Sequence, residues 1–143
     1  MSKHRHHKHH SLRVTWDGKT IAGVDRVSPL TRLVEVITVR DGSSPHGGEH
    51  TAPGRMTSAP VTLERPAGGD SAFEDWAASA SSIGTRKDVG IEILNRDGET
   101  VLSYRLHRCW VTEYQASLLE PGERAIAIER LRLENDGWER IPI

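Results

Sequence analysis

The stretch VGIEILNRDGETVLSYRLHRCW, Val89 to Trp110, carries the clearest strand pattern of the chain. Its apolar residues recur at every second position, which is the period of a β-strand. The Asp97-Gly98 pair in its middle favours a tight turn. The two expected faces are Val89, Ile91 and Ile93 before the turn, and Leu102, Tyr104, Leu106, Arg108 and Trp110 after it. The stretch therefore predicts an antiparallel β-hairpin.

The segment RAIAIERLRLE, Arg124 to Glu134, also alternates, but its apolar face changes sides along its length. Ile126 and Ile128 lie on one face, whereas Leu131 and Leu133 lie on the other. A strand in an isolated two-layer domain should keep one face buried throughout, so this exchange needs an explanation. Within the segment, Glu129 is interpreted as a paired or wall-facing charge and not as a catalytic base.

Further strands are expected towards the N-terminus. The segments Leu12 to Trp16 and Thr20 to Val24 flank an Asp17-Gly18 turn and predict a second hairpin. The run Arg32 to Arg40 is apolar and β-branched on both faces, so we expect both sides of it to be covered. A short strand is also expected from Val61 to Arg65.

The segment Asp41 to Pro60 is dominated by Gly, Pro, Ser and Thr and has no hydrophobic period. It predicts a long loop. Loops of this length without internal structure are uncommon in compact domains and are usually functional or disordered. We therefore expect this segment to be a contact arm that reaches a neighbouring subunit.

One helix is predicted, at about residues 71–83 in the segment DSAFEDWAASASSIG. Ser71 and Glu74 have the spacing of a capping box, and Gly84 can close the helix in a left-handed conformation. Its apolar stripe is Phe73, Trp76, Ala77, Ala80 and Ile83. The opposite face carries only Ala and Ser, which is typical either of an ordinary solvated surface or of one that approaches another surface closely.

Together these segments predict a mainly β, or α+β, domain with one helix among about eight strands. The chain has 143 residues, of which 36% are hydrophobic, so we expect one domain over residues 12–143 with a thin core that neighbouring chains help to bury. The first eleven residues are expected to form a flexible tail. The net charge of −1 gives no support for wholesale nucleic-acid binding.

The sequence lacks the common signatures of enzymes and of membrane insertion. It has no Gly-rich phosphate loop, no nucleophile elbow and no His-Glu-x-x-His motif, so neither catalysis nor a cofactor is predicted. No apolar run approaches the roughly 18 residues that a membrane helix needs. Cys109 is the single cysteine and is interpreted as a structural thiol; its spacing from His107 is a weak metal signal. These features favour a protein made in the cytosol.

The N-terminal segment MSKHRHHKHH offers an alternative function. Clustered imidazoles chelate divalent transition metals, so a His-rich metal-binding β-domain would bind metal stoichiometrically as a monomer. The candidate ligands are His4, His6, His7, His9 and His10. The segment has no apolar residue after Met1 to dock it, so we expect a tail without a selected metal role.

The residues from Arg86 to Arg140 resemble the tail-tube protein family of contractile phage tails and bacterial contractile injection systems. The resemblance is carried by RKDVGIEILNRDGETVLSYRLHRCWVTEYQ, a following SLL turn, and AIAIERLRLENDGWER. The earlier stretches AGVDRVSPL and VTLERP, and the helix with Trp76, are also similar. The chain departs from the family at Val111, where members usually have a proline that kinks the strand.

The resemblance implies a structural subunit of an inner tube and no enzymatic activity. Members have two packed antiparallel β-sheets in a barrel-like sandwich with a flanking helix, and strands of a homo-hexamer close into one β-barrel. Rings stack into a hollow tube, assembled in the cytoplasm, that becomes part of a virion or contractile particle. The implied partners are a contractile sheath, baseplate and spike proteins, and cargo effector or DNA in the lumen. A baseplate tube-initiator subunit is the alternative within the family.

This architecture offers an explanation for the strand that changes faces. A bulge near Glu129-Arg130 could carry the strand from its own core to a wall shared with a neighbour. The isoleucines and the leucines would then be buried by different partners. The resulting candidates for inter-subunit contact are His46, Gly47, Gly48, Glu49, His50, Ile126, Ile128, Glu129, Leu131 and Leu133.

Overall fold

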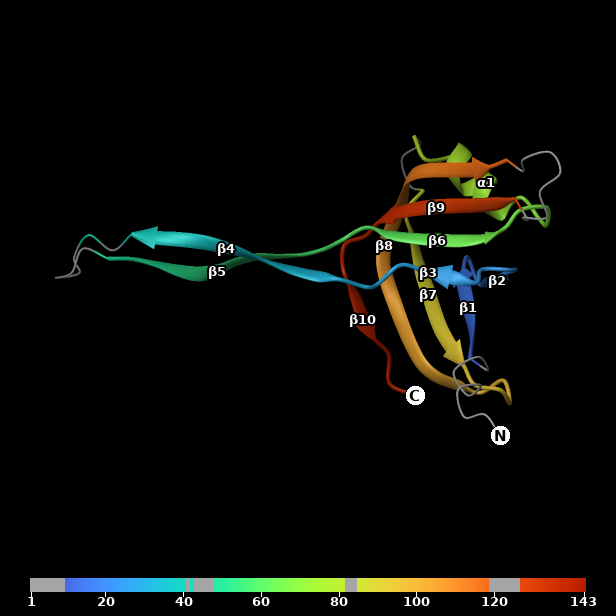
Figure 1. The fold of residues 1–143 in the computed structure, drawn as a ribbon, viewed down its shortest axis with the longest axis horizontal. Helices are drawn as coiled ribbons and strands as arrows, with labels where there is room; N and C mark the ends of the chain where they lie inside the picture. Colours follow the sequence, from blue (N-terminus) through green and yellow to red (C-terminus); the bar gives the residue numbers. More distant parts are fainter. Residues whose placement is uncertain (1–9, 41, 43–47, 82–84, 119–126) are drawn as a thin grey trace.

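A computed structural model describes residues 10–40, 42, 48–81, 85–118 and 127–143. These residues form ten β-strands and one α-helix, which confirms the mainly β class. Eight strands belong to a body of two packed antiparallel layers, and two form an arm that projects from it (Figure 1). The order of hydrogen-bonded strands in the body is β2-β1-β7-β8-β9-β6-β3, with β10 pairing β8.

The first layer contains both predicted hairpins. Val14 pairs with Ile21 across the tight turn at Asp17 and Gly18, whose φ angles are 55° and 72°. The second strand of this hairpin is shorter than predicted, because it ends at Ile21 and not at Val24. The strands of the layer are β1 (Ser11–Trp16), β2 (Lys19–Ile21), β7 (Lys87–Leu94), the first half of β8 (Thr100–Ser117) and β10 (Trp138–Arg140).

The second layer includes the expected short strand, observed as β6 (Val61–Pro66). Its central strand is β9 (Ile128–Glu134), which pairs with β6 on one side and with the second half of β8 on the other. The edge strand β3 (Arg26–Val27) completes the layer. Because β8 runs through both layers, its curvature in Figure 1 closes one side of the sandwich.

A bulge in β8 changes which side chains face the core. Lys87 pairs with Cys109 while Val89 pairs with Leu106, so β8 has an extra residue at this point, and Arg108 there has a φ of 50°. Leu106 is buried before the bulge, and Cys109 is buried after it. The prediction of one continuous face from Leu102 to Trp110 is therefore wrong, because the extra residue reverses the alternation.

The bulge predicted near Glu129-Arg130 is absent from β9. Its register with β6 runs without a shift from Leu133 opposite Val61 to Ile128 opposite Pro66. Leu131 and Leu133 are wholly buried in the core of their own subunit, and Ile128 lies half-buried on the opposite face. Ile126 lies outside the described residues, so its expected contact stays a prediction.

The helix α1 (Ala72–Ala78) is shorter than the predicted 71–83, and Ile83 and Gly84 lie outside the described residues. Phe73 and Trp76 are buried, with ring centroids 6.0 and 4.8 Å from that of Trp16. The predicted capping box does not form. The Ser71 hydroxyl donates to the Asp75 carboxylate, and the Asp70 carboxylate accepts from the Ala72 amide at 3.0 Å.

The core lies between the two layers and under α1. Its buried apolar residues are Val14, Trp16, Ile21, Val24, Val61, Leu63, Phe73, Trp76, Val89, Ile91, Leu106, Cys109, Val111, Leu131 and Leu133. This set comes from both layers and the helix, and none of it comes from the arm. The body therefore has a core of its own.

The arm is formed by β4 (Arg32–Arg40) and β5 (Glu49–Ser58), which pair only with each other (Figure 1). The prediction of a structureless loop over 41–60 is therefore wrong for residues 49–58. The prediction that both faces of 32–40 are covered is also not met within one subunit, because almost every residue of β4 is exposed. The strand projects beyond the body and has no second layer beside it.

Candidate functional site

The arm carries five of the eight large apolar side chains that the described residues leave exposed. Val36 is 73% exposed, Met56 60%, Leu33 51%, Val34 48% and Ile37 39%. Val34, Val36 and Met56 share one face of the ribbon and Leu33 and Ile37 the other, so apolar side chains are exposed on both faces. Exposed apolar side chains gathered in this way usually mark an interaction site in a soluble protein. A two-stranded ribbon is also marginally stable alone in water, so the arm is expected to gain stability from a partner. We call these five side chains the arm surface.

A local irregularity explains how a Gly- and Pro-rich segment forms a strand. Val34 pairs with Met56 and Val36 with Pro53, so β5 accommodates an extra residue between them. A Cβ on Gly54 would lie 2.9 Å from Cγ2 of Ile37, so the close approach favours glycine. Pro53 lacks an amide donor, which an unpaired strand edge tolerates. The high Gly and Pro content of this segment therefore led to the wrong prediction of a loop.

The base of the arm is attached to the body by polar contacts. The Arg32 guanidinium donates to the Trp138 carbonyl oxygen at 2.7 Å and lies 4.0 Å from the centroid of its ring. The Asn135 amide donates to the Ala59 carbonyl oxygen at 3.2 Å. Because Trp138 and Asn135 flank the turn between β9 and β10, these contacts tie both strands of the arm to one corner of the sandwich.

The far end of the arm contains part of the predicted contact set. Glu49 and His50 are exposed in β5, and Glu49 forms an ion pair with Arg40 of β4. Gly48 is half-buried just before the strand, and His46 and Gly47 lie outside the described residues. The structure therefore places Glu49 and His50 where a neighbouring molecule can reach them, and their contact role stays a prediction.

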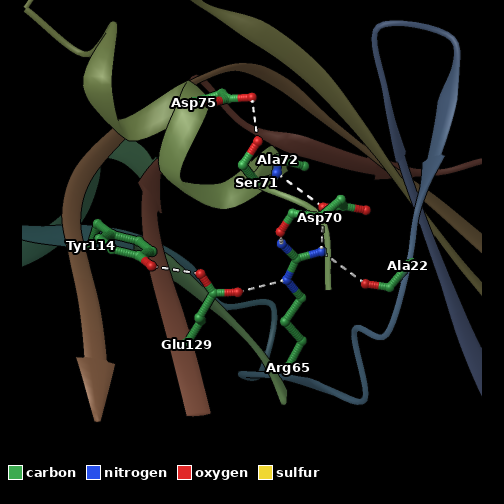
Figure 2. A network of polar contacts seen from close by, with 8 residues as sticks. All are labelled: Ala22, Arg65, Asp70, Ser71, Ala72, Asp75, Tyr114 and Glu129. Carbon is green, nitrogen blue, oxygen red and sulfur yellow. Dashed lines mark hydrogen bonds and ion pairs between the residues drawn. The ribbon is translucent and has the colours of Figure 1, made fainter. Parts of the chain in front are cut away.

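A buried polar network joins α1 to the second layer (Figure 2). Arg65 is 2% exposed and Glu129 4%, and the guanidinium donates to the carboxylate at 3.0 Å. Arg65 also donates to the carbonyl oxygens of Ala22 at 3.0 Å and Asp70 at 2.9 Å. Its guanidinium lies 4.3 Å from the centroid of the Phe73 ring. One side chain thus links β6, β9, the segment after β2 and the segment before α1.

The second oxygen of Glu129 is also bonded, because the Tyr114 hydroxyl donates to it at 2.5 Å. Burial, together with the hydrogen bond to this carboxylate, raises the pKa of Tyr114, so the tyrosine stays protonated as a donor. The interpretation of Glu129 as a paired charge is confirmed, with Arg65 as its partner. Its adjacent residue Arg130 instead pairs with Glu64 at 2.9 Å.

Three predicted contact residues are too deeply buried to touch a neighbouring subunit. Glu129 is 4% exposed, and Leu131 and Leu133 are fully buried in their own subunit. Their selection as inter-subunit contacts is corrected for that reason. The buried pair has a signal in the sequence: Arg65 follows Val61 and Leu63 at every second position, as Glu129 precedes Leu131 and Leu133.

The thiol and imidazole of β8 do not form a metal site. Cys109 is fully buried, and burial, with smaller contributions from Asp88 and Asp136, raises the pKa of its thiol to about 12. The His107 imidazole instead contacts the Glu139 carboxylate at 2.6 Å. Across the described part of the chain, no three His, Cys, Asp or Glu side chains gather as metal ligands would. Of the predicted tail ligands, only His10 is described, and it is exposed.

The profile of one protein family, described as T4-like virus tail tube protein gp19, matches residues 8–139. The chain belongs to this tail tube protein family. The resemblance seen in the sequence is therefore confirmed, and the protein is a structural subunit of a tail tube. No curated protein sequence matches it.

Solved structures of tube proteins share the fold of this tail tube subunit. A chain of the sheath-tube complex of an extracellular contractile injection system, PVC, in its extended state has a TM-score of 0.80 and 22% identity. That match covers 93% of this chain and 89% of the other. A chain of the anti-feeding prophage baseplate matches with a TM-score of 0.72 and 19% identity over 92% and 91% of the two chains.

A more distant likeness is Hcp1 from Flavobacterium johnsoniae, with a TM-score of 0.54 and 16% identity. It covers 92% of this chain and 99% of Hcp1. The tail tube subunit therefore has a fold shared by contractile particles and by Hcp. The alternative of a His-rich metal-binding domain is not favoured, because the family match spans almost the whole chain.

Within the part of the chain that the structure describes, no helix is long and apolar enough to cross a membrane. Every buried side-chain nitrogen or oxygen atom of the described residues has a hydrogen-bond partner. The tail tube subunit thus uses its buried polar groups to hold elements together.

Proposed function

We propose that the protein forms a homo-hexameric ring whose copies stack into a hollow inner tube. The observation that carries this proposal is the arm surface, which one subunit leaves exposed. Burying it against a neighbouring subunit removes apolar area from water, at about 25 cal/mol per Å². The same contact stabilises a ribbon that has no second layer of its own. Assembly thereby supplies the cover that the sequence predicts for β4.

Closure of the ring would also cover the free strand edges of the subunit. The body ends in the short strands β2 and β3, and the free edges of β4 and β5 offer further backbone donors and acceptors. Exposed edges invite uncontrolled pairing, and closing a sheet into a barrel removes them. We propose that strands of adjacent subunits pair in this way to line one continuous lumen.

The proposed partners follow from the contexts of the structural neighbours. One neighbour is part of a sheath-tube complex and another part of a baseplate. By analogy, this tube is wrapped by a contractile sheath, grows from a baseplate with a spike, and holds cargo effector or DNA in its lumen. It assembles in the cytoplasm and acts within a virion or contractile particle, without catalytic activity or membrane insertion of its own.

We propose that the chain has two parts, a domain and an N-terminal tail. The single tube-forming domain begins at Ser11, the first residue of β1, one residue before the predicted start at residue 12. The residues before it form a tail without a metal role. Nickel or zinc uptake by the full chain and by a version without residues 1–10 tests the tail. We expect no metal bound by the domain itself.

Negative-stain microscopy of the purified protein tests the proposal. We expect rings or tubes with a central channel, whereas a uniform small monomer in all conditions would contradict the proposal. Rings that never extend would indicate the initiator subunit of the same family. The informative variant is Val36→Asp with Met56→Asp, because it places two charges on the arm surface.

The control is Val101→Asp, which adds one negative charge at an apolar residue of the body that is 39% exposed; the single variants Val36→Asp and Met56→Asp match it in charge. We expect the arm variant to stay monomeric with an unchanged circular dichroism spectrum. The control should assemble like the parent protein. Tubes of normal length from the arm variant would refute the role of the arm.

A further inference from the structure

A cavity of about 380 Å³ lies between the β1–β2 turn and helix α1. The buried rings of Trp16 and Trp76 contribute to its wall. Charged side chains surround it, among them Asp17, Lys19 and Asp75. Most of the lining residues are polar or charged, and the two buried tryptophan rings add an apolar wall. Aromatic walls with convergent polar groups are features of sites that bind a partner.

Two of these charges remain without an opposite charge. Lys87 pairs with Asp17, with 2.5 Å between the ammonium and the carboxylate. The carboxylate of Asp75 accepts only from the Ser71 hydroxyl, and neither it nor Lys19 forms an ion pair with any residue that the structure describes. The cavity thus presents one free anion and one free cation to an incoming segment.

A turn at the opposite end of the same layer carries the complementary pair. Arg96 and Asp97 are exposed in the β7–β8 turn, and neither forms an ion pair with a described residue. The side-chain oxygen of Asn95 accepts from the backbone amides of Asp97 and Glu99, each at 2.9 Å. The turn is therefore held in one conformation, which lowers the entropy lost on docking.

The register shows that the turn and the cavity lie at opposite ends of β1. Ser11 pairs with Leu94 beside the turn, whereas Thr15 pairs with Gly90 close to the cavity end. At about 3.3 Å per residue, β1 spans roughly 17 Å between them. Translating one copy along this strand direction brings its turn towards the cavity of the next. Such a head-to-tail contact does not close on itself and generates a filament.

We propose that the β7–β8 turn of one subunit docks in the α1 cavity of a second copy in the adjoining ring, with Arg96 facing Asp75 and Asp97 facing Lys19. This rests on the proposed tube function and specifies its stacking contact. The arm leaves the body across the direction of β1 and β7 (Figure 1). Ring closure and stacking therefore use separate surfaces of the subunit.

Charge reversal tests the contact. Arg96→Glu in the full-length protein places like charges opposite one another in every copy, so we expect isolated rings and at least a roughly tenfold fall in sedimentable tube. The combination of Arg96→Glu with Asp75→Arg restores opposite charges and should recover tubes. The matched control is Arg105→Glu, an exposed arginine of β8 in the middle of the layer.

The readouts are tube length by microscopy, ring content by analytical ultracentrifugation and folding by circular dichroism. Tubes of parental length from Arg96→Glu would overturn the contact, as would loss of rings together with tubes in a folded variant. Failure of the paired substitution to restore tubes would also count against it. If the parent protein forms neither rings nor tubes, the proposed function itself fails, which is a separate result.

Discussion

Arg65 and Glu129 form the most buried ion pair of the described residues, and each compensates the buried charge of the other. Removing one partner leaves the other charge buried without compensation, which typically costs about 3–5 kcal/mol. Arg65 retains its contacts with Ala22 and Asp70, but these are to carbonyl oxygens and to a half-exposed carboxylate. Glu129 is thus the residue that neutralises the guanidinium within the core.

We predict that Glu129→Leu lowers the free energy of unfolding by about 3–5 kcal/mol in urea titrations. Glu129→Gln should cost less, about 1–2 kcal/mol, because its amide oxygen still accepts from Arg65. Replacing both partners, Arg65→Met with Glu129→Leu, should recover part of the loss. Equal losses for the Leu and Gln variants would show that the hydrogen bond retained by Gln is unimportant and that the loss comes from removing the charge.

The buried thiol of Cys109 should make the free energy of unfolding depend on pH. Burial raises the pKa of its thiol from 9.0 to about 12, so the folded chain holds a proton that the unfolded chain releases above pH 9. This contribution to stability is fully present below pH 9 and is lost as the pH rises towards 12. The slope is at most about 1.4 kcal/mol per pH unit.

Urea titrations at several pH values above 9 should show a shallower decline for Cys109→Ala than for the parent. The thiol should also resist alkylation at pH 8 until the protein unfolds. Parallel declines for the two proteins, or rapid alkylation of the folded parent, would contradict the assignment.

At the scale of elements, the bulge in β8 decides which residues enter the core. Arg108 adopts a φ of 50°, its amide donates to the Asp88 carboxylate at 3.0 Å, and its side chain is mostly exposed. Left-handed backbone costs a non-glycine residue about 1–2 kcal/mol, most severely when the side chain is β-branched. The bulge therefore carries a modest backbone strain at Arg108, and it turns the side chains of Cys109 and Val111 towards the core.

Substitutions at this position should separate backbone strain from side-chain contacts. We predict that Arg108→Val lowers the free energy of unfolding by about 1–2 kcal/mol. Arg108→Gly should change it by less than about 1 kcal/mol, because relief of strain offsets the greater entropy of the unfolded chain. Thermal and urea unfolding of both variants provide the measurement. A glycine variant less stable than the valine variant would refute the explanation.

At the scale of the whole molecule, the body should fold without help from the outer part of the arm. The buried core draws no residue from β4 or β5. We predict that deleting residues 46–51 leaves the thermal midpoint of the monomer within a few degrees and abolishes tube growth. Replacing the same residues with a Gly/Ser segment of equal length distinguishes loss of reach from loss of sequence. Normal tubes from the deletion, or an unfolded monomer, would contradict this prediction.

Several features could be predicted because they depend on neighbouring residues along the chain. The two hairpins follow from alternation around Asp-Gly turns, and both form. The apolar stripe predicts the site of the helix, which ends earlier than expected, whereas the predicted cap does not form. Ser71 has a backbone outside the β region, with φ −102° and ψ 20°, and Asp70 caps the Ala72 amide from the preceding position. Cap geometry depends on how the chain enters the helix, which spacing alone does not give.

Sequence alone determined the mainly β class and the strand pairs closed by tight turns, because periodicity and turn chemistry are local, and its resemblance to tail-tube proteins indicated the family. Tertiary structure decided where the alternation breaks, that Arg65 and Glu129 meet inside the core, and that a Gly- and Pro-rich segment forms a strand of the arm. Each of these depends on contacts between residues distant in the chain. Whether a β-branched run is buried or exposed depends on what packs against it, and within one subunit nothing described covers β4.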